Sequence, residues 1–277
     1  MDWPKVKTLL ILLFAAINLI LLGNIYSLEW QKFRVDSQVI EGAIAVLENN
    51  GVSIDQELIN PQREVMEEAD LRFTGEEKQN AALRLLDTQA DQLEMVPGED
   101  VSAAVYRTAQ GTLTLWDDCS VEFVSAQGWA GEDFQQAARL VGDRLSGTDL
   151  GMEWMPMEHT EEGETRFSLQ QTWQDIPIEG CELEVTVSAD GTVQATGRWI
   201  CGQMVPTETG SITDSVSSLL LYPVYRTSSG SITIETVEPV YVPQISVTGS
   251  SLQPCYHIED DRGGEMWIQA FTGEQIQ

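Results

Sequence analysis

The chain has 277 residues, with 44 Asp or Glu against 15 Lys or Arg, and its formal net charge at pH 7 is −29. This acidity excludes binding to the phosphate backbone of nucleic acids, because proteins that bind there carry clusters of Lys and Arg. The charges are dispersed along a chain that contains eight Trp, which indicates a folded domain rather than a disordered acidic tail.

The first predicted element is an apolar helix from about Thr8 to Ile25, preceded by Lys5 and Lys7. A run of roughly 20 apolar residues can span a bilayer, and no A-x-A cleavage pattern follows it. The lysines predict a cytoplasmic N-terminus. We therefore expect residues 1–28 to be a cytoplasmic stub and an uncleaved transmembrane anchor in the cell membrane. The alternative is a long signal peptide with an unusual cleavage site; in both cases the bulk of the chain is extracytoplasmic.

The predicted anchor carries one strongly polar side chain, Asn18, near its middle. An intramembrane Asn can donate and accept hydrogen bonds with a neighbouring helix. We expect Asn18, together with Leu12, Phe14 and Leu22, to contact the spanning helix of a partner. The alternative is that Asn18 satisfies its own hydrogen bonds or reaches the outer headgroup region.

Beyond the anchor, helical and strand patterns alternate along the chain. Helices are predicted at 36–50, with Asp36 or Ser37 as cap, at 131–145, and at 213–222 with a Thr or Asp cap. The segment 52–59 is predicted as a strand, 61–97 is ambiguous with a helical part at "EEKQNAALRLLD", and strands fill most of the remainder.

This order predicts an α+β fold: an N-terminal transmembrane helix, then two related units of antiparallel sheet with helices packed on one face. The helices that begin near residues 36 and 132 suggest a loose duplication. We expect one extracytoplasmic unit at 29–128 and a second at 129–277.

The four cysteines, Cys119, Cys181, Cys201 and Cys255, form no C-x-x-C pair, so zinc-ribbon and thioredoxin patterns are absent. Cys181 and Cys201 flank a predicted hairpin and are each ten residues from Gly191. They are a candidate disulfide in an oxidising compartment, and two buried free thiols are the alternative.

Several residue groups were tested for chemistry and none predicts an enzyme. Cys255, His257 and Glu259 alternate on one strand face and could ligate a metal, but a single His without a fourth ligand favours an ordinary half-buried strand. The carboxylate pairs Glu161–Glu162 and Asp260–Asp261 lie in predicted turns. Carboxyl groups in turns are solvated, so their pKa values are not raised as general acid catalysis requires. The Trp residues on strands favour core packing over a carbohydrate platform. We therefore predict no catalytic residue, no metal and no cofactor.

Three stretches resemble the YycI-type (YycH/YycI) family of bacterial membrane proteins. They are the start, "MDWPKVKTLLILLFAAINLILL", the predicted hairpin "FSLQQTWQDIPIEGCELEVTVSADGTVQATGRW" with Gln171, Pro177 and Gly191, and the closing "PCYHIEDDRGGEMWIQAFTGE". The last of these is similar to the terminal hairpin of PepSY-like modules. The strong acidity and the four cysteines depart from the family pattern.

The resemblance implies a single-pass regulatory protein of a two-component system. Members of the family associate with a sensor histidine kinase that controls cell-wall metabolism and with a related YycH-type membrane protein, through transmembrane and extracytoplasmic contacts. The alternative function is a PepSY-like extracytoplasmic inhibitor or binding module for a protease or a wall component.

Overall fold

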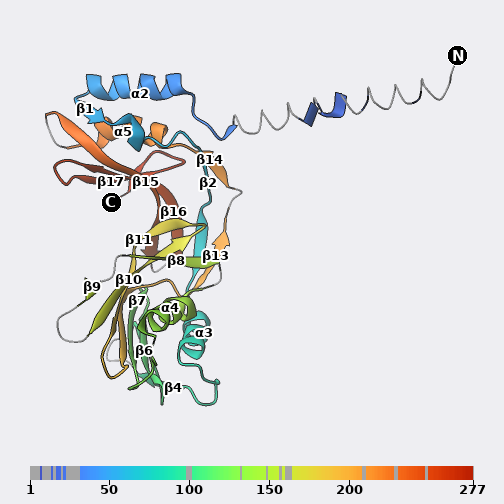
Figure 1. The fold of residues 1–277 in the computed structure, drawn as a ribbon, viewed down its shortest axis with the longest axis vertical. Helices are drawn as coiled ribbons and strands as arrows, with labels where there is room; N and C mark the ends of the chain where they lie inside the picture. Colours follow the sequence, from blue (N-terminus) through green and yellow to red (C-terminus); the bar gives the residue numbers. More distant parts are fainter. Residues whose placement is uncertain are drawn as a thin grey trace. The chain divides into compact units, whose positions relative to one another are not determined.

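A computed structural model of the chain describes residues 7, 14, 17–19, 21, 22, 32–97, 102–131, 133–147, 149–155, 158, 159, 164–207, 210–227, 230–246 and 249–276 (Figure 1). Within these residues the fold is α+β, with mostly antiparallel strand pairing, as the sequence predicts.

The chain divides into two compact units that interleave along the sequence. Unit 1 is Met1–Met66, Gly210–Glu238 and Tyr256–Gln277, and unit 2 is Glu67–Thr209 and Pro239–Cys255. This division differs from the predicted boundary between residues 128 and 129. The reason is strand pairing across that boundary: strand β7 (Ser120–Ser125) pairs antiparallel with strand β12 (Val193–Arg198), with Ala195 opposite Phe123.

Unit 2 is built on an antiparallel sheet in the order β10-β11-β12-β7-β6-β5-β4, and β8 and β9 pair with the outer side of β10. Strands β3 and β13 pair with each other in the same unit. The remaining bounds are β3 Ala69–Arg72, β4 Glu94–Pro97, β5 Ala103–Thr108, β6 Gly111–Trp116, β8 Leu150–Trp154, β9 Glu158–His159, β10 Thr165–Trp173, β11 Ile176–Val187 and β13 Gln203–Pro206.

Helices α3 (Gly75–Leu85) and α4 (Phe134–Leu145) cover one face of this sheet. Thr74 and Glu77 form a capping box at the start of α3, and the Asp133 side chain caps α4. Both helices bury small and aliphatic residues spaced three and four apart, which lets them pack closely on the strands. The core between helices and sheet includes Ala81, Leu85, Ala138, Val141, Leu145, Phe167, Leu169, Leu183, Val185 and Trp199.

Unit 1 packs helix α2 (Ser37–Asn49) with helix α5 (Ser215–Tyr225) over a second core. Strand β1 pairs parallel with β15, and β17 pairs with β16 and β18. Strands β15 and β16 contribute residues to both units. The bounds are β1 Val52–Ile54, η1 Gln56–Leu58, β2 Glu64–Met66, β14 Ser211–Thr213, β15 Ile232–Ser246, β16 Gly249–Asp260, β17 Glu265–Gln269 and β18 Gln275–Ile276.

The predicted helices are confirmed, with local differences. Asp36 caps α2 by accepting a hydrogen bond from Gln38 N, and Asp214 caps α5. Helix α5 continues past Pro223 to Tyr225. The strand predicted at 52–59 ends at Ile54, because Asp55 caps the short helix η1 instead.

The structure describes only some residues of the predicted N-terminal anchor. Phe14, Asn18 and Leu22 are helical and exposed, whereas Leu12 and most of the apolar run lie outside the described residues. In the part of the chain that is described, no helix has the length and apolar character needed to cross a membrane.

The predicted hairpin between Cys181 and Cys201 exists as β11 and β12, but these cysteines are not joined. Leu183 lies opposite Gly197, whereas a register that places Cys181 opposite Cys201 would put Leu183 opposite Trp199. All four cysteines are free and buried. The alternative of buried thiols therefore describes this structure.

Candidate partner-binding surface

The face of the unit 2 sheet that the helices leave open is polar. Strand residues alternate across the sheet, so the neighbours of the buried Phe167, Val185 and Ala195 point the other way. The pairing register places one row of such residues side by side across five strands. This row is Ser168, Glu184, Thr196, Glu122 and Thr114.

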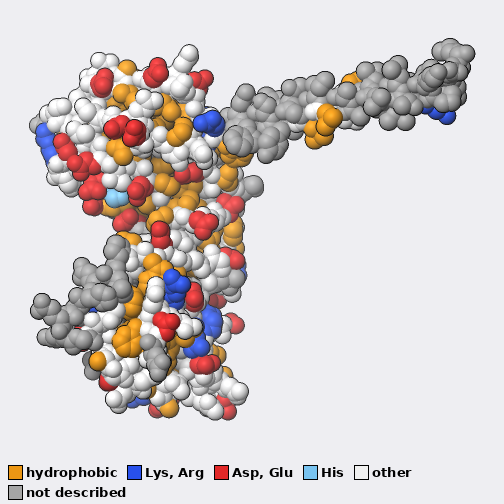
Figure 2. Space-filling model, in the orientation of Figure 1, with side chains coloured by type: hydrophobic (Ala, Val, Ile, Leu, Met, Phe, Trp, Pro, Cys, Tyr) orange, Lys and Arg blue, Asp and Glu red, His pale blue; other side chains and the backbone are white. Residues whose placement is uncertain are grey.

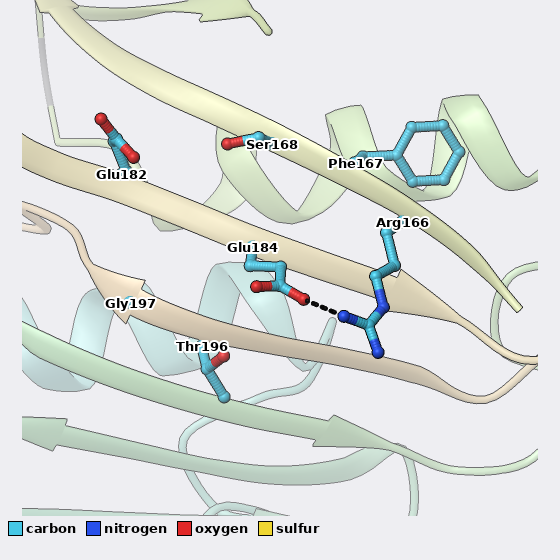
Figure 3. A pocket seen from close by; sticks show the side chains of 7 residues that line it. All are labelled: Arg166, Phe167, Ser168, Glu182, Glu184, Thr196 and Gly197. Atoms are coloured by element: carbon cyan, nitrogen blue, oxygen red, sulfur yellow. Dashed lines mark ion pairs between the residues drawn. The ribbon is translucent and has the colours of Figure 1, made fainter. Parts of the chain in front are cut away.

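A hollow of about 380 Å³ lies on this open face (Figure 3). Short residues lie at its centre, with charged residues around them. Its lining comes from β10, β11 and β12 and consists of Arg166, Phe167, Ser168, Glu182, Glu184, Thr196 and Gly197. Phe167 belongs to the core packed under the helices, so the other six residues supply the accessible side chains and backbone.

Gly197 lines the hollow at a point where two strand backbones approach closely. Its φ is +149°, and a Cβ at this position would lie 2.1 Å from the carbonyl oxygen of Glu182 on the neighbouring strand. A side chain here would force the two strand backbones apart. The glycine therefore lets the backbones of β11 and β12 lie close together beside the hollow.

The charges around the hollow do not cancel. Arg166 Nη1 lies 3.4 Å from Glu184 Oε1, and both side chains are about half exposed (46% and 54%), so this pair is weak. Glu182 has no ion-pair partner among the described residues. Arg198, the next cation along β12, has its guanidinium near Gly180, where Nη1 would lie 3.6 Å from an added Cβ.

A second cavity in unit 2, of about 590 Å³, shows no catalytic chemistry. It is lined by Asp117, Asp118, Cys119 and Phe73 together with residues of β15 and β16. Burial raises the pKa of the Cys119 thiol to about 12, so the thiol is protonated and a poor nucleophile at neutral pH. Burial acts in the same direction on the pKa values of Cys181 and Cys255.

The strand group Cys255, His257 and Glu259 does not assemble a metal site. The His257 ring stacks on Trp267, with the ring centroids 4.9 Å apart and an interplanar angle of 8°. The described residues include no group of three His, Cys, Asp or Glu side chains placed to hold a metal ion.

The carboxylate pair Asp260–Asp261 stabilises a turn. The prediction that both carboxylates are solvated was wrong for Asp260. Asp260 is buried rather than solvated, with 3% exposure. It accepts hydrogen bonds from the Tyr222 hydroxyl (2.7 Å) and from Arg262 N and Gly264 N (2.9 Å each). Asp261 accepts a hydrogen bond from Thr233 N. Glu161 and Glu162 lie outside the described residues.

Unit 1 contains a buried polar cluster that the sequence reasoning missed. Glu64 pairs across β2 and β14 with Thr213, whose hydroxyl lies 3.1 Å from the Tyr256 hydroxyl. Burial raises the pKa of Glu64 above its usual 4.5, against hydrogen bonds from Asn60 and Tyr256 that lower it. Glu64 Oε2 and, at the start of α5, Ser215 Oγ are buried and have no hydrogen-bond partner among the described residues.

The acidic side chains are spread over the visible face of the molecule rather than gathered in one patch (Figure 2). This distribution agrees with the dispersed charge in the sequence and leaves the hollow over Gly197 as the site with the best-defined geometry. The signal that could have found it is the glycine inside the strand pattern "VQATGRW", since glycine within a strand marks a bulge or a close backbone approach.

One comparison with known families matches a segment that includes this region. A family model described as the Fungalysin/Thermolysin Propeptide Motif matches residues 157–198. This segment runs from β9 to the end of β12 and contains every residue that lines the hollow. No curated protein matches the chain.

Proposed function

We propose that this chain is a non-enzymatic regulatory protein that modulates a sensor histidine kinase through transmembrane and extracytoplasmic contacts. The observation that carries the extracytoplasmic part is the hollowed polar face of β10, β11 and β12, which lies inside the matched propeptide motif. A sheet that is supported on its other face by α3 and α4 can present such a surface with little rearrangement on binding.

The membrane part of the proposal rests on the N-terminal sequence. Residues 1–28 serve as a single-pass anchor with a cytoplasmic N-terminus, and Asn18 contacts a helix of the kinase or of a YycH-type protein. Anchoring raises the effective concentration of the outer domain beside its partner, so a weak contact through the sheet face suffices for regulation. The outer domain is proposed to consist of two related α+β units.

The test is site-specific photo-crosslinking of the full-length protein in membranes. A crosslinker at Thr196, on the open sheet face, is compared with one at Gln135, which is exposed on α4. We expect the kinase to be captured from Thr196 and not from Gln135, and kinase output to change on Asn18→Leu. Equal capture from both positions, or no capture of a kinase, contradicts the proposal.

A second candidate function is favoured by the family match alone. The Fungalysin/Thermolysin Propeptide Motif is named for a protease propeptide, so the chain is alternatively an extracytoplasmic inhibitor or binding module for a protease. Full-length protein in detergent micelles, titrated into a thermolysin-type metalloprotease, then lowers the proteolytic rate at stoichiometric concentrations. An unchanged rate removes this alternative.

A further inference from the structure

We infer that the hollow over Gly197 receives a lysine or arginine side chain from a basic segment of the partner protein. This inference rests on the proposed function, because it uses the same face of β10, β11 and β12. It adds the chemical class of the ligand: a cationic polypeptide rather than an anion, a lipid surface or an apolar helix.

The arrangement of carboxylates is the first argument. Glu182 and Glu184 are two residues apart on β11, so their side chains leave the same face of the strand, roughly 7 Å apart along it. Figure 3 shows them beside Ser168 and Thr196, which are too short to fill the space between. An ammonium or guanidinium group at that point reaches carboxylate oxygens on two sides and the hydroxyls of Ser168 and Thr196.

The balance of charge is the second argument. Arg166 is already paired with Glu184, which leaves Glu182 without an ion-pair partner among the described residues. Glu122 adds a further carboxylate, because it lies directly opposite Thr196 on β7. Arg198 follows Gly197 on β12 and lies opposite Ser120, on the same strand face as Thr196. The hollow and its border thus hold three carboxylates and two arginines, and a cationic group is the ligand that neutralises the remaining negative charge.

The charge of the whole chain is the third argument. Residues 35–277 carry a net charge of −31, since residues 1–34 carry +2. A field of this sign accelerates the approach of a basic partner and repels an anionic one. Because the hollow is open to solvent, each ion pair in it is weak, and the expected contribution is selectivity and rate rather than tight binding.

The experiment measures binding of two synthetic peptides, (Lys-Thr)4 and (Glu-Thr)4, to the full-length protein in neutral detergent micelles at low salt. The test variant is Glu182→Gln with Glu184→Gln. The control variant is Glu41→Gln with Glu48→Gln, which removes the same charge from exposed positions on α2. A third variant, Thr196→Lys, places a cation of the chain's own inside the hollow.

We expect the lysine peptide to bind and the glutamate peptide not to bind. The double substitution in the hollow should raise the dissociation constant of the lysine peptide by about 3- to 20-fold, as the loss of two exposed ion pairs implies. Thr196→Lys should weaken binding comparably, whereas the α2 control should change it by less than about twofold. Each variant must show the circular dichroism spectrum of the parent protein.

Equal weakening by the hollow variant and the α2 control overturns the inference, since the peptide then responds only to net charge. Spermidine that competes as well as the lysine peptide overturns the polypeptide part of the inference. These outcomes are separate from those of the proposed function. Capture of the kinase from Thr196 without selective binding of the lysine peptide supports the proposed function and contradicts this inference. Selective binding of the lysine peptide without kinase capture supports a cation-binding hollow and contradicts the proposed function.

Discussion

Both units bury apolar side chains, but they differ in whether their buried polar atoms have hydrogen-bond partners. In unit 2, Gln171 is fully buried, and its amide donates to Ile200 O (2.9 Å) and accepts from Ile200 N (2.8 Å). In unit 1, polar atoms of several side chains are buried with no hydrogen-bond partner in the described part of the chain, and unit 2 contributes none to this set. They are Glu64 Oε2, Ser215 Oγ, His257 Nε2 and Trp267 Nε1, together with Arg63 Nε, which has no hydrogen bond but lies 3.5 Å from Asp214 Oδ2 in an ion pair.

This difference shows that the two cores have different sensitivities. A buried polar group that is fully paired rigidifies its surroundings, whereas an unpaired one costs free energy that any partner, proton or water molecule can recover. Unit 2, which holds the candidate binding surface, is therefore expected to respond to the loss of packing or of a hydrogen bond. Unit 1 is expected to respond to pH.

The largest expected effect is the loss of an aliphatic side chain from either core. Leu169→Ala in unit 2 should lower the free energy of unfolding by about 2–5 kcal/mol, because the site is fully buried under α4. Leu47→Ala, fully buried in unit 1, should cost a similar amount. Denaturant unfolding measures both, and a cost below about 1 kcal/mol at one site alone would break the equivalence of the two cores.

The next effect tests the paired polar group of unit 2. Gln171→Leu should cost about 1–3 kcal/mol, since it keeps the volume but leaves Ile200 N and O without their partners. The matched control is Gln194→Leu, on the exposed face of β12, which should change stability by less than about 0.5 kcal/mol. Similar values for the two variants would mean that the Gln171 hydrogen bonds contribute nothing net.

A smaller effect is expected at Asp260 in unit 1, and it depends on pH. Although desolvation opposes it, the hydrogen bonds from Tyr222, Gly264 and Arg262 lower the pKa of Asp260 below its usual 3.8. The lowered pKa contributes stability that is present above pH 3.8 and is lost as the pH falls through the folded-state value. Asp260→Asn should therefore cost about 1–2 kcal/mol at pH 7 and less below pH 3. A cost that does not change with pH would assign the effect to packing.

The smallest effect has the opposite sign. Burial raises the pKa of Glu64 above 4.5, so the folded protein binds this proton more tightly than the unfolded chain does. The resulting contribution to folding stability is fully present below pH 4.5 and is lost as the pH rises through the folded-state pKa. Glu64→Gln should therefore stabilise the protein at pH 7 relative to the parent and have little effect at pH 4. Thermal unfolding at the two pH values measures this, with Glu48→Gln on the exposed side of α2 as control. Destabilisation at pH 7 would show that the Glu64 charge is compensated.

Local signals in the sequence predicted the helices of both units well. Asp36, Asp133 and Asp214 precede apolar periodic runs and cap α2, α4 and α5, so the physical cause of each helix lies within a few residues. The hairpin of β11 and β12, centred near Gly191, was likewise predicted from local sequence.

The division into units and the candidate surface could not be predicted in the same way, because both depend on pairing between distant segments. Nothing near Glu122 indicates that it lies opposite Thr196, and nothing near Val52 indicates that it pairs with Ile232. The buried cluster at Glu64 could not be predicted from the sequence for the same reason. Its neighbours Thr213 and Tyr256 come from segments about 150 to 190 residues away.

The interleaved order of unit 1 has a consequence for how the protein is made. Helix α2 packs in a core with Leu219 and Ile232, which are synthesised long after it. At about 5–20 residues per second, Ile232 leaves the ribosome roughly 10 to 40 s after Leu47. Throughout that interval α2 can pack only on nearby segments such as β1, and the part of its apolar side that contacts α5 stays uncovered. The nascent chain must therefore be shielded from aggregation until its later segments arrive.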